Sequence, residues 1–189
     1  MTAFAPTLDA ALAARIRLVC FDVDGVLTDG GILLGDVAGA RVELKQYDIQ
    51  DGLGIVMLRQ AGLLTAIITG RESESVALRA KELQVDELVQ DRHARKLPAL
   101  HKLLERHGLG LGEVAFVGDD LPDLGVMRVV GLPVCVANGT AEAKAAARLH
   151  LTRSGGRGAV REFCEVLLRA RGEWDRQVEA YVTSRSEVA

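Results

Sequence analysis

The segment Phe21-Asp22-Val23-Asp24-Gly25-Val26-Leu27-Thr28-Asp29-Gly30 places two carboxylates one residue apart, where an apolar stretch runs into a glycine-containing turn. The preceding residues, 16–21, are mostly apolar and predict a short buried strand. In an open parallel sheet, ligands bind just beyond the carboxyl ends of the strands. Asp22 and Asp24 are therefore expected at the ligand-binding edge of such a sheet.

Strand-like and helix-like segments alternate along the rest of the chain. Strands are expected at 16–21, 64–68, 87–89, 114–117, 132–136 and 149–151, and helices at 7–15, 51–61, 73–83, 96–107, 141–147 and 157–170. Because the expected strands are apolar on both faces, the pattern favours an α/β fold, a Rossmann-like, doubly wound parallel sheet with helices on both sides. The second helix is predicted to be capped by Asp51 and to end at Gly62.

Two segments stand outside this alternation. Residues 30–45 predict a projecting β-hairpin, because 32–34 and 41–44 are strand-like and flank a glycine-bearing turn. An exposed apolar hairpin invites association, so it is the expected contact between subunits. The tail, 172–189, has one Trp and mixed charges and is expected either to be disordered or to dock on a partner.

Composition narrows the class of protein. A chain of 189 residues with 49% hydrophobic residues and no Pro/Ser-rich linker predicts a single domain, 1–189. The net charge of −3 argues against nucleic acid and anionic membranes as partners. No run approaches the roughly 20 apolar residues of a membrane span and no secretion signal is seen, so a cytoplasmic location is expected.

The cysteines and histidines of this chain suggest neither a catalytic nor a metal-binding site. Cys20, Cys135 and Cys164 are odd in number and scattered, and are expected to be reduced core residues. The four histidines lack metal-ligand spacing and receive no role.

Polar clusters follow three of the expected apolar strands, and a lysine begins the helix that follows a fourth. The residues are Asp22 and Asp24; Thr69, Gly70 and Arg71; Asp119, Asp120 and Asp123; and Lys96. Taken singly, each cluster is also compatible with ordinary helix caps and turns, and the lysine with a solvated side chain. Taken together, carboxylates from two strand ends form a hard oxygen site that suits Mg²⁺, with waters and a substrate phosphate as further ligands.

These motifs resemble, in the same order, those of the haloacid dehalogenase superfamily phosphatases, and the match covers nearly the whole chain. The segments 22–30, 51–55 and 155–162 are also similar to the 3-deoxy-D-manno-octulosonate 8-phosphate (KDO 8-phosphate) phosphatases, a small branch without a cap domain that usually forms homotetramers. The resemblance implies a Mg²⁺-dependent phosphomonoesterase that releases KDO and phosphate and supplies lipopolysaccharide precursor synthesis. Two alternatives stay open: a phosphatase of a nine-carbon sialic or deaminated sialic acid 9-phosphate, and a non-catalytic tetramerisation module of the same fold.

The resemblance also implies the roles of the catalytic residues. Asp22 would attack phosphorus and form an aspartyl-phosphate intermediate. Asp24 would protonate the leaving sugar oxygen and later activate the hydrolytic water. Thr69 would bind phosphoryl oxygens, and Lys96 would hold their charge in place.

A Mg²⁺ site is implied in the same way. Its ligands would be the Asp22 carboxylate, the Asp24 backbone carbonyl and Asp119. Asp120 and Asp123 would orient the catalytic lysine and a water on the metal. From its position alone, Asp123 is equally compatible with a first-turn helix residue favoured by the helix dipole.

The substrate is expected to be a phosphorylated sugar acid. The residues implied to bind it are Asp24, Asp48, Asp51, Gly52, Thr69, Gly70, Arg71, Arg79, Lys96 and Arg157. Arginines suit a sugar acid because a guanidinium pairs bidentately with a carboxylate. From the residues alone, Arg79 is equally compatible with a surface helix position, and 155–158 with a flexible loop. The chain has Asp48, Val56 and Asp91 where the family often has Asn, a basic residue and Gly.

Overall fold

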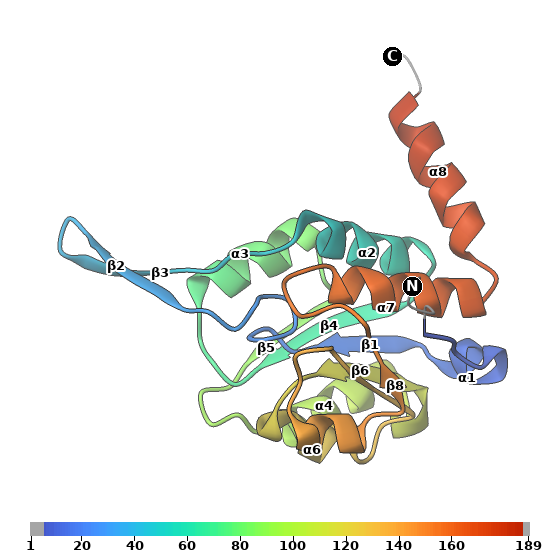
Figure 1. Ribbon diagram of the computed structural model, residues 1–189, viewed down its shortest axis with the longest axis horizontal. Helices are drawn as coiled ribbons and strands as arrows, with labels where there is room; N and C mark the ends of the chain where they lie inside the picture. The colour runs from blue at the N-terminus through green and yellow to red at the C-terminus, as the bar shows by residue number, and fades with distance from the viewer. Residues whose placement is uncertain (1–5, 187–189) are drawn as a thin grey trace.

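A computed structural model describes residues 6–186 of the chain. Its centre is a six-stranded, all-parallel sheet in the order β5-β4-β1-β6-β7-β8 (Figure 1). The strands are β1 (Leu18–Phe21), β4 (Leu64–Thr69), β5 (Glu87–Gln90), β6 (Val114–Gly118), β7 (Leu132–Cys135) and β8 (Leu149–His150). The chain runs outward from β1 to β5 and then returns to β6 on the other side of β1. This reversal creates a crevice at the carboxyl ends of β1 and β6, where ligands bind in such sheets.

Helices cover both faces of the sheet, which confirms the predicted α/β fold (Figure 1). They are α1 (Ala10–Arg15), α2 (Ile49–Gln60), α3 (Glu74–Leu83), α4 (Lys96–His107), α5 (Leu124–Met127), α6 (Ala141–Ala146), α7 (Ala159–Ala170) and α8 (Trp174–Ser186), with short 3₁₀ turns at Leu111–Glu113 and Leu121–Asp123. Successive residues of β1 face opposite sides of the sheet. Val19 and Phe21 pack in the core beneath α2 and α7, and Leu18 and Cys20 pack in the core beneath α4.

The start of α2 differs from the prediction. Asp48, not Asp51, caps the helix, and its carboxylate accepts a hydrogen bond from the Gln50 N–H at 2.7 Å. Asp51 lies in the first turn and accepts a hydrogen bond from the Arg161 N–H of α7 at 2.7 Å. The predicted end is confirmed, since Gly62 follows the helix with φ +84°.

Two other helices begin later than the sequence pattern suggests. Helix α1 starts at Ala10 because Asp9 caps it, accepting from the Leu12 N–H at 2.8 Å. Helix α7 starts at Ala159 because Gly158 has a left-handed backbone with φ +89°. A residue in that conformation lies outside a right-handed helix.

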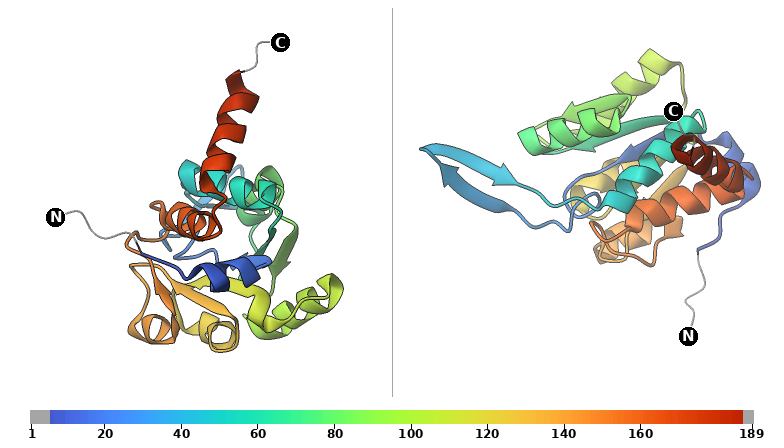
Figure 2. Two further views of the ribbon diagram at one scale, coloured as in Figure 1. Left: turned by 90° about the vertical axis from the view of Figure 1, so that its right-hand side faces the viewer. Right: turned by 90° about the horizontal axis from the view of Figure 1, so that it is seen from above.

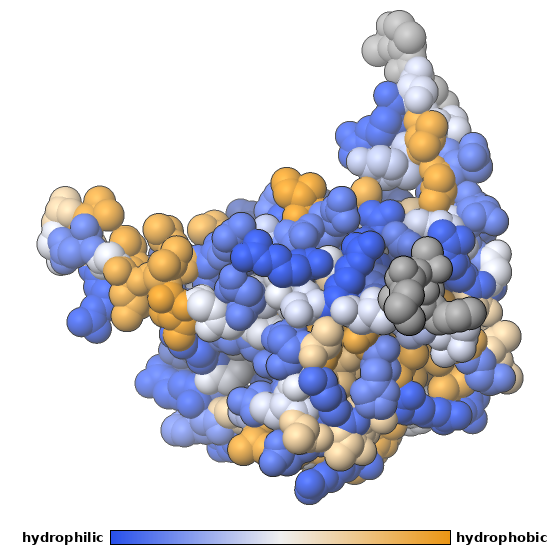
Figure 3. All heavy atoms as spheres, viewed as in Figure 1, coloured by the Kyte–Doolittle hydropathy of each residue, from blue (hydrophilic) through white to orange (hydrophobic). Residues whose placement is uncertain are grey.

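The predicted hairpin is present. Strands β2 (Leu33–Val37) and β3 (Ala40–Leu44) pair antiparallel and project from the body of the molecule (Figure 1). The two residues between them, Ala38 and Gly39, both have positive φ, as a type I′ hairpin turn requires. Apolar side chains gather on this arm (Figure 3). Leu34 is 67% exposed, so the arm does not bury its own apolar surface.

The tail is helical as far as the structure describes it. Helix α8 stands away from the helical layer (Figure 2), so, of the two alternatives for the tail, disorder is wrong for Trp174–Ser186, and docking on a partner stays a prediction. Trp174 packs the first turn of α8 against α7, because the guanidinium groups of Arg161 and Arg169 of α7 lie 5.1 and 5.0 Å from the centroid of its ring. The final residues, 187–189, lie outside the described residues.

Two further sequence predictions concern the cysteines and a membrane-spanning helix. Cys20, Cys135 and Cys164 are buried and unpaired by disulfides, which confirms that they are core residues. Among residues 6–186, no helix has the length and apolarity to cross a membrane.

Candidate active site

A cavity of about 220 Å³ opens at the carboxyl ends of β1, β4 and β6. Most of the polar residues predicted from the strand ends line it, together with Ala94 and Pro122. They are Asp22, Asp24, Thr69, Gly70, Arg71, Lys96, Asp119 and Asp120. The structure thus brings together residues that lie almost a hundred positions apart in the sequence.

Lys96 lies at the centre of the charged groups on the cavity floor. Its ammonium nitrogen is 2.6 Å from Asp22 Oδ1 and 2.6 Å from Asp123 Oδ1, and its side chain is almost fully buried. Burial alone would lower the pKa of Lys96, but the carboxylates of Asp22 and Asp123 outweigh it and raise that pKa. The lysine is therefore a permanent cation beside Asp22.

Asp123 holds this arrangement from below. While its Oδ1 receives Lys96, its Oδ2 accepts the backbone N–H groups of Asp119 at 2.9 Å and Asp120 at 3.3 Å. Both oxygens are thus occupied by groups of the protein. Asp120 caps the turn Leu121–Asp123 by accepting from the Leu121 N–H at 2.7 Å.

The carboxylates of Asp22, Asp119 and Asp123 have the spacing of a cation site. One oxygen from each lies within 4.8 Å of the others. Within residues 6–186, the buried Asp119 Oδ1 accepts no hydrogen bond. Because Asp123 already has two sets of donors, Asp22 and Asp119 are the carboxylates free to bind a metal.

The electrostatics of the site also favour a divalent cation. The cluster holds three carboxyl groups and one ammonium group, which pairs with two of them, so it has an excess of negative charge when all three are ionised. Burial and the charge of Asp123 raise the pKa of Asp22 to about 7, although Lys96 opposes this shift. Burial and the charge of Asp22 raise the pKa of Asp119 to about 8. A hard divalent cation such as Mg²⁺ would cancel this repulsion, so the residues suit it.

Two glycines allow the loops around the cavity to approach one another closely. A Cβ at Gly25 would lie 2.1 Å from Asp119 Oδ2, and the residue has φ +92°. A Cβ at Gly70 would lie 2.8 Å from the Cβ of Ala94. Thr69 is buried at the end of β4, where its hydroxyl accepts from the Arg71 N–H at 3.3 Å.

The hairpin supplies two residues that the sequence did not single out. Lys45 Nζ contacts Asp24 Oδ1, and Glu43 Oε2 accepts from Arg71 Nη2 at 2.6 Å. Glu43 and Lys45 share a face of the extended chain because they are two residues apart. The sequence shows this spacing, but it does not show that the face of the hairpin with Glu43 and Lys45 meets the edge of the sheet.

Several predicted substrate-binding residues lie outside the cavity. Asp48 caps α2, and its carbonyl oxygen accepts from Arg79 Nη2 at 3.2 Å. Arg79 lines a separate, larger cavity of about 660 Å³ between the hairpin and α3, and its guanidinium lies 5.5 Å from the centroid of the Tyr47 ring. Gly52 packs against the same arginine, since a Cβ there would meet Arg79 Nη2 at 2.4 Å.

Asp51 and Arg157 also lie away from the cavity. Asp51 ties α2 to α7 through the Arg161 N–H, and burial raises its pKa to about 6. Arg157 is exposed and pairs with Asp29 at 3.3 Å. Their part in substrate binding stays a prediction.

Comparison with known proteins identifies the family. Residues 89–163 match the model of the haloacid dehalogenase-like hydrolases. The chain is 42% identical over 165 residues to the 3-deoxy-D-manno-octulosonate 8-phosphate phosphatase KdsC of Escherichia coli (strain K12), covering 87% of this chain and 86% of that protein. This chain belongs to the KDO 8-phosphate phosphatase family of haloacid dehalogenase-like hydrolases.

Solved structures of the phosphatase family have the same fold. The crystal structure of the Moraxella catarrhalis KDO 8-phosphate phosphatase, in complex with magnesium, phosphate and KDO, has a TM-score of 0.85 and 41% identity, covering 91% of this chain and 97% of that one. The Yersinia pestis phosphatase has a TM-score of 0.82 and 40% identity, covering 88% of both chains. These matches confirm the predicted fold and the predicted resemblance to phosphatases.

Proposed function

We propose that this protein is a Mg²⁺-dependent phosphatase that hydrolyses KDO 8-phosphate to KDO and phosphate. The observation that carries the proposal is the cavity in which Asp22, Lys96 and Asp119 meet, where one carboxylate lies beside a buried ammonium group and a second has an oxygen without a donor among the described residues. Membership of the phosphatase family supports the reaction, and the M. catarrhalis complex with magnesium, phosphate and KDO supports both metal and substrate.

The proposed reaction is the one that the family resemblance implies. An oxygen of Asp22 attacks phosphorus and forms the aspartyl-phosphate while the bond from phosphorus to the sugar oxygen breaks. Asp24 gives its proton to that leaving oxygen. Water then attacks the aspartyl-phosphate and returns a proton to Asp24, so phosphate is released and Asp22 is regenerated.

The remaining groups of the cavity bind and orient the phosphoryl group. Lys96, held by Asp22 and Asp123, places its charge beside the attacking oxygen. Thr69, which lines the cavity, and the backbone N–H groups next to it would donate to phosphoryl oxygens, as the family resemblance implies. The carboxylates of Asp22 and Asp119 and the carbonyl of Asp24 would hold Mg²⁺, which supplies positive charge to the transferring phosphoryl group.

The test is a substrate panel with purified protein and Mg²⁺. Phosphate release from KDO 8-phosphate should be far faster than from hexose phosphates or from a nine-carbon sialic acid 9-phosphate. Equal rates on the three classes would contradict the specificity, and preference for the nine-carbon acid would select that alternative. Asp22→Asn should abolish turnover of all of them, since an amide cannot act as the nucleophile.

The alternative of a non-catalytic module has less support. A purely structural domain needs neither a buried lysine between two carboxylates nor a free, buried carboxylate oxygen on Asp119. A stable assembly that turns over no phosphate ester would nevertheless select it.

We also propose assembly into a homotetramer through the hairpin. The exposed apolar side chains of the projecting arm support it, because such surface in water favours association. A cytoplasmic place in lipopolysaccharide precursor synthesis follows from the proposed substrate and stays a prediction.

A further inference from the structure

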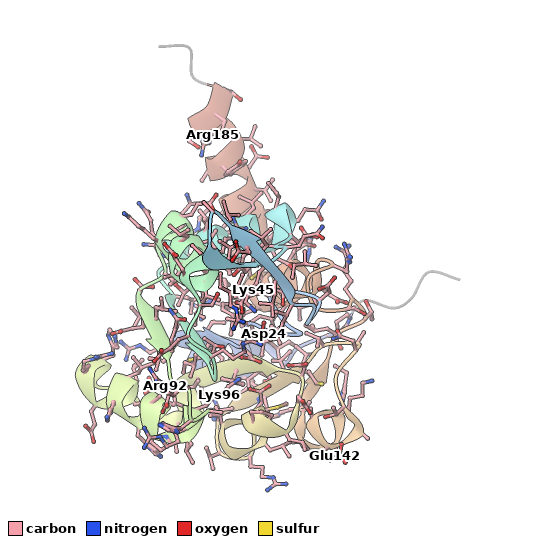
Figure 4. All side chains as sticks on the ribbon, turned by 90° about the vertical axis from the view of Figure 1, so that its left-hand side faces the viewer. Asp24, Lys45, Arg92, Lys96, Glu142 and Arg185 are labelled. Atoms are coloured by element: carbon pink, nitrogen blue, oxygen red, sulfur yellow. The ribbon has the colours of Figure 1, made fainter. Side chains whose placement is uncertain are left out.

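Lys45 is a buried cation that the proposed reaction does not use. It follows directly after β3, so the returning strand of the hairpin delivers it to the sheet edge. Its side chain has no exposed surface. Its ammonium nitrogen contacts Asp24 Oδ1 and lies 3.5 Å from Glu43 Oε1, and Figure 4 shows Lys45 and Asp24 beside each other at the foot of the hairpin.

The surroundings of Lys45 argue for a role toward Asp24 rather than toward substrate. Burying an ammonium group is costly unless carboxylates pair with it, and here Asp24 and Glu43 both do so. A cation already neutralised by two carboxylates is poorly suited to attract a substrate anion. Lys45 is also absent from the lining of the cavity that holds Asp22, and lines instead the larger cavity between the hairpin and α3.

The contacts leave one oxygen of Asp24 available. Lys45 occupies Oδ1, whereas Arg71 Nε lies 3.9 Å from Oδ2, beyond hydrogen-bond distance. Glu43 restrains the same arginine through its 2.6 Å contact with Nη2. Asp24 is thus fixed on one side and free on the other.

We propose that Lys45 is a positioning residue that fixes the Asp24 carboxylate so that its Oδ2 is aimed at the leaving-group oxygen. This inference rests on the proposed function, in which Asp24 donates a proton to that oxygen. Because general acid catalysis requires hydrogen-bond distance in the reacting complex, loss of the restraint should slow the chemical step more than it weakens substrate binding.

Lys45→Met removes the charge while keeping the length of the side chain. With KDO 8-phosphate, or with whichever alkyl phosphate the enzyme prefers, kcat should fall about 10- to 100-fold while KM changes little. With p-nitrophenyl phosphate the loss of kcat/KM, which reports the steps up to release of the alcohol, should be much smaller, because p-nitrophenolate leaves without a proton. Lys45→Arg, which keeps the cation, should recover part of the alkyl phosphate activity.

The matched control is Lys81→Met, a change of the same kind on the exposed surface of α3, which should alter neither substrate's kinetics. Mg²⁺ affinity and the melting temperature of Lys45→Met, measured in parallel, report whether the site still folds. An equal loss of kcat/KM on both esters, or a rise in KM with kcat unchanged, would overturn the positioning role. Turnover of p-nitrophenyl phosphate does not depend on the natural sugar, so a wrong substrate assignment would leave this comparison intact.

Discussion

Gly25 shows how closely the carboxylates of the candidate site depend on a residue without a side chain. Its backbone is left-handed, and an added Cβ would lie 2.1 Å from Asp119 Oδ2. Gly25→Ala should therefore displace Asp119 and weaken Mg²⁺ binding, in addition to a backbone cost of about 1–3 kcal/mol in the free energy of unfolding. Calorimetric titration with Mg²⁺ and chemical denaturation measure the two effects. Gly62→Ala, at an equally left-handed glycine with open space around it, is the control that should lose stability alone.

The raised pKa values of Asp22 and Asp119 predict how pH and metal act on stability. Both carboxyls titrate near 3.8 when unfolded but near 7 and 8 in the folded, metal-free protein. Folding thus favours the protonated forms of both carboxyls. Their contribution to the free energy of unfolding is therefore greatest below about pH 4 and is lost as the pH rises toward 8. Since Mg²⁺ binds the ionised carboxylates, the metal should compete with protons and bind more tightly at pH 8 than at pH 6.

The expected measurement is the rise in melting temperature on adding a fixed concentration of Mg²⁺, which should be larger at pH 8 than at pH 6. Asp119→Asn removes one of the two proposed carboxylate ligands and should abolish most of the rise at either pH. A rise in the native protein that is independent of pH would show that the two carboxyls do not titrate in this range.

Among the helices, α2 depends on a single cap. The Asp48 side chain accepts from the Gln50 N–H at 2.7 Å, and this bond satisfies a backbone donor that the helix itself leaves free. Asp48→Ala should lower the free energy of unfolding by about 1 kcal/mol, measured by urea denaturation, whereas Asp48→Asn keeps an acceptor and should be nearly neutral. Equal losses in both variants would indicate that the charge, and not the cap, stabilises this end.

The elements also show which features a sequence can predict. Helix α4 is found at its predicted bounds, because Lys96 follows an irregular loop and Gly108 adopts the left-handed conformation that ends a helix. The start of α2 could not be fixed, because Asp48 and Asp51 are equally good caps locally. Only a distant contact, the Arg161 N–H, assigns Asp51 another partner.

The same distinction applies to the candidate site. Strand-end positions are set by local pattern and parallel topology, so the sequence alone predicts that Asp22, Thr69 and Asp119 lie together. It does not predict the place of Lys45, because the approach of that lysine to Asp24 depends on the direction in which the hairpin leaves the sheet. For Arg79 and Arg157 the family resemblance suggested a substrate contact, but both have protein partners outside the cavity.

At the scale of the whole molecule, the hairpin carries both the proposed subunit contact and the residues that reach Asp24. Its outer part exposes apolar side chains such as Leu33 and Leu34, while its base delivers Glu43 and Lys45 to Asp24. If the hairpin forms the proposed subunit contact, a charge among its apolar residues should both dissociate the tetramer and disturb Asp24. Leu34→Asp should therefore lower the mass measured by light scattering and reduce turnover of alkyl phosphates.

Helix α8 provides the matched control, because Val182 is also an exposed apolar residue on a projecting element. Val182→Asp should leave both mass and activity unchanged if the hairpin alone holds the subunits. Dissociation by Val182→Asp but not by Leu34→Asp would instead assign the contact to α8. A monomeric Leu34→Asp variant with full activity would separate the two roles of the hairpin. In that case the hairpin would assemble the subunits, but its base, which carries Lys45, would keep its position within a single chain.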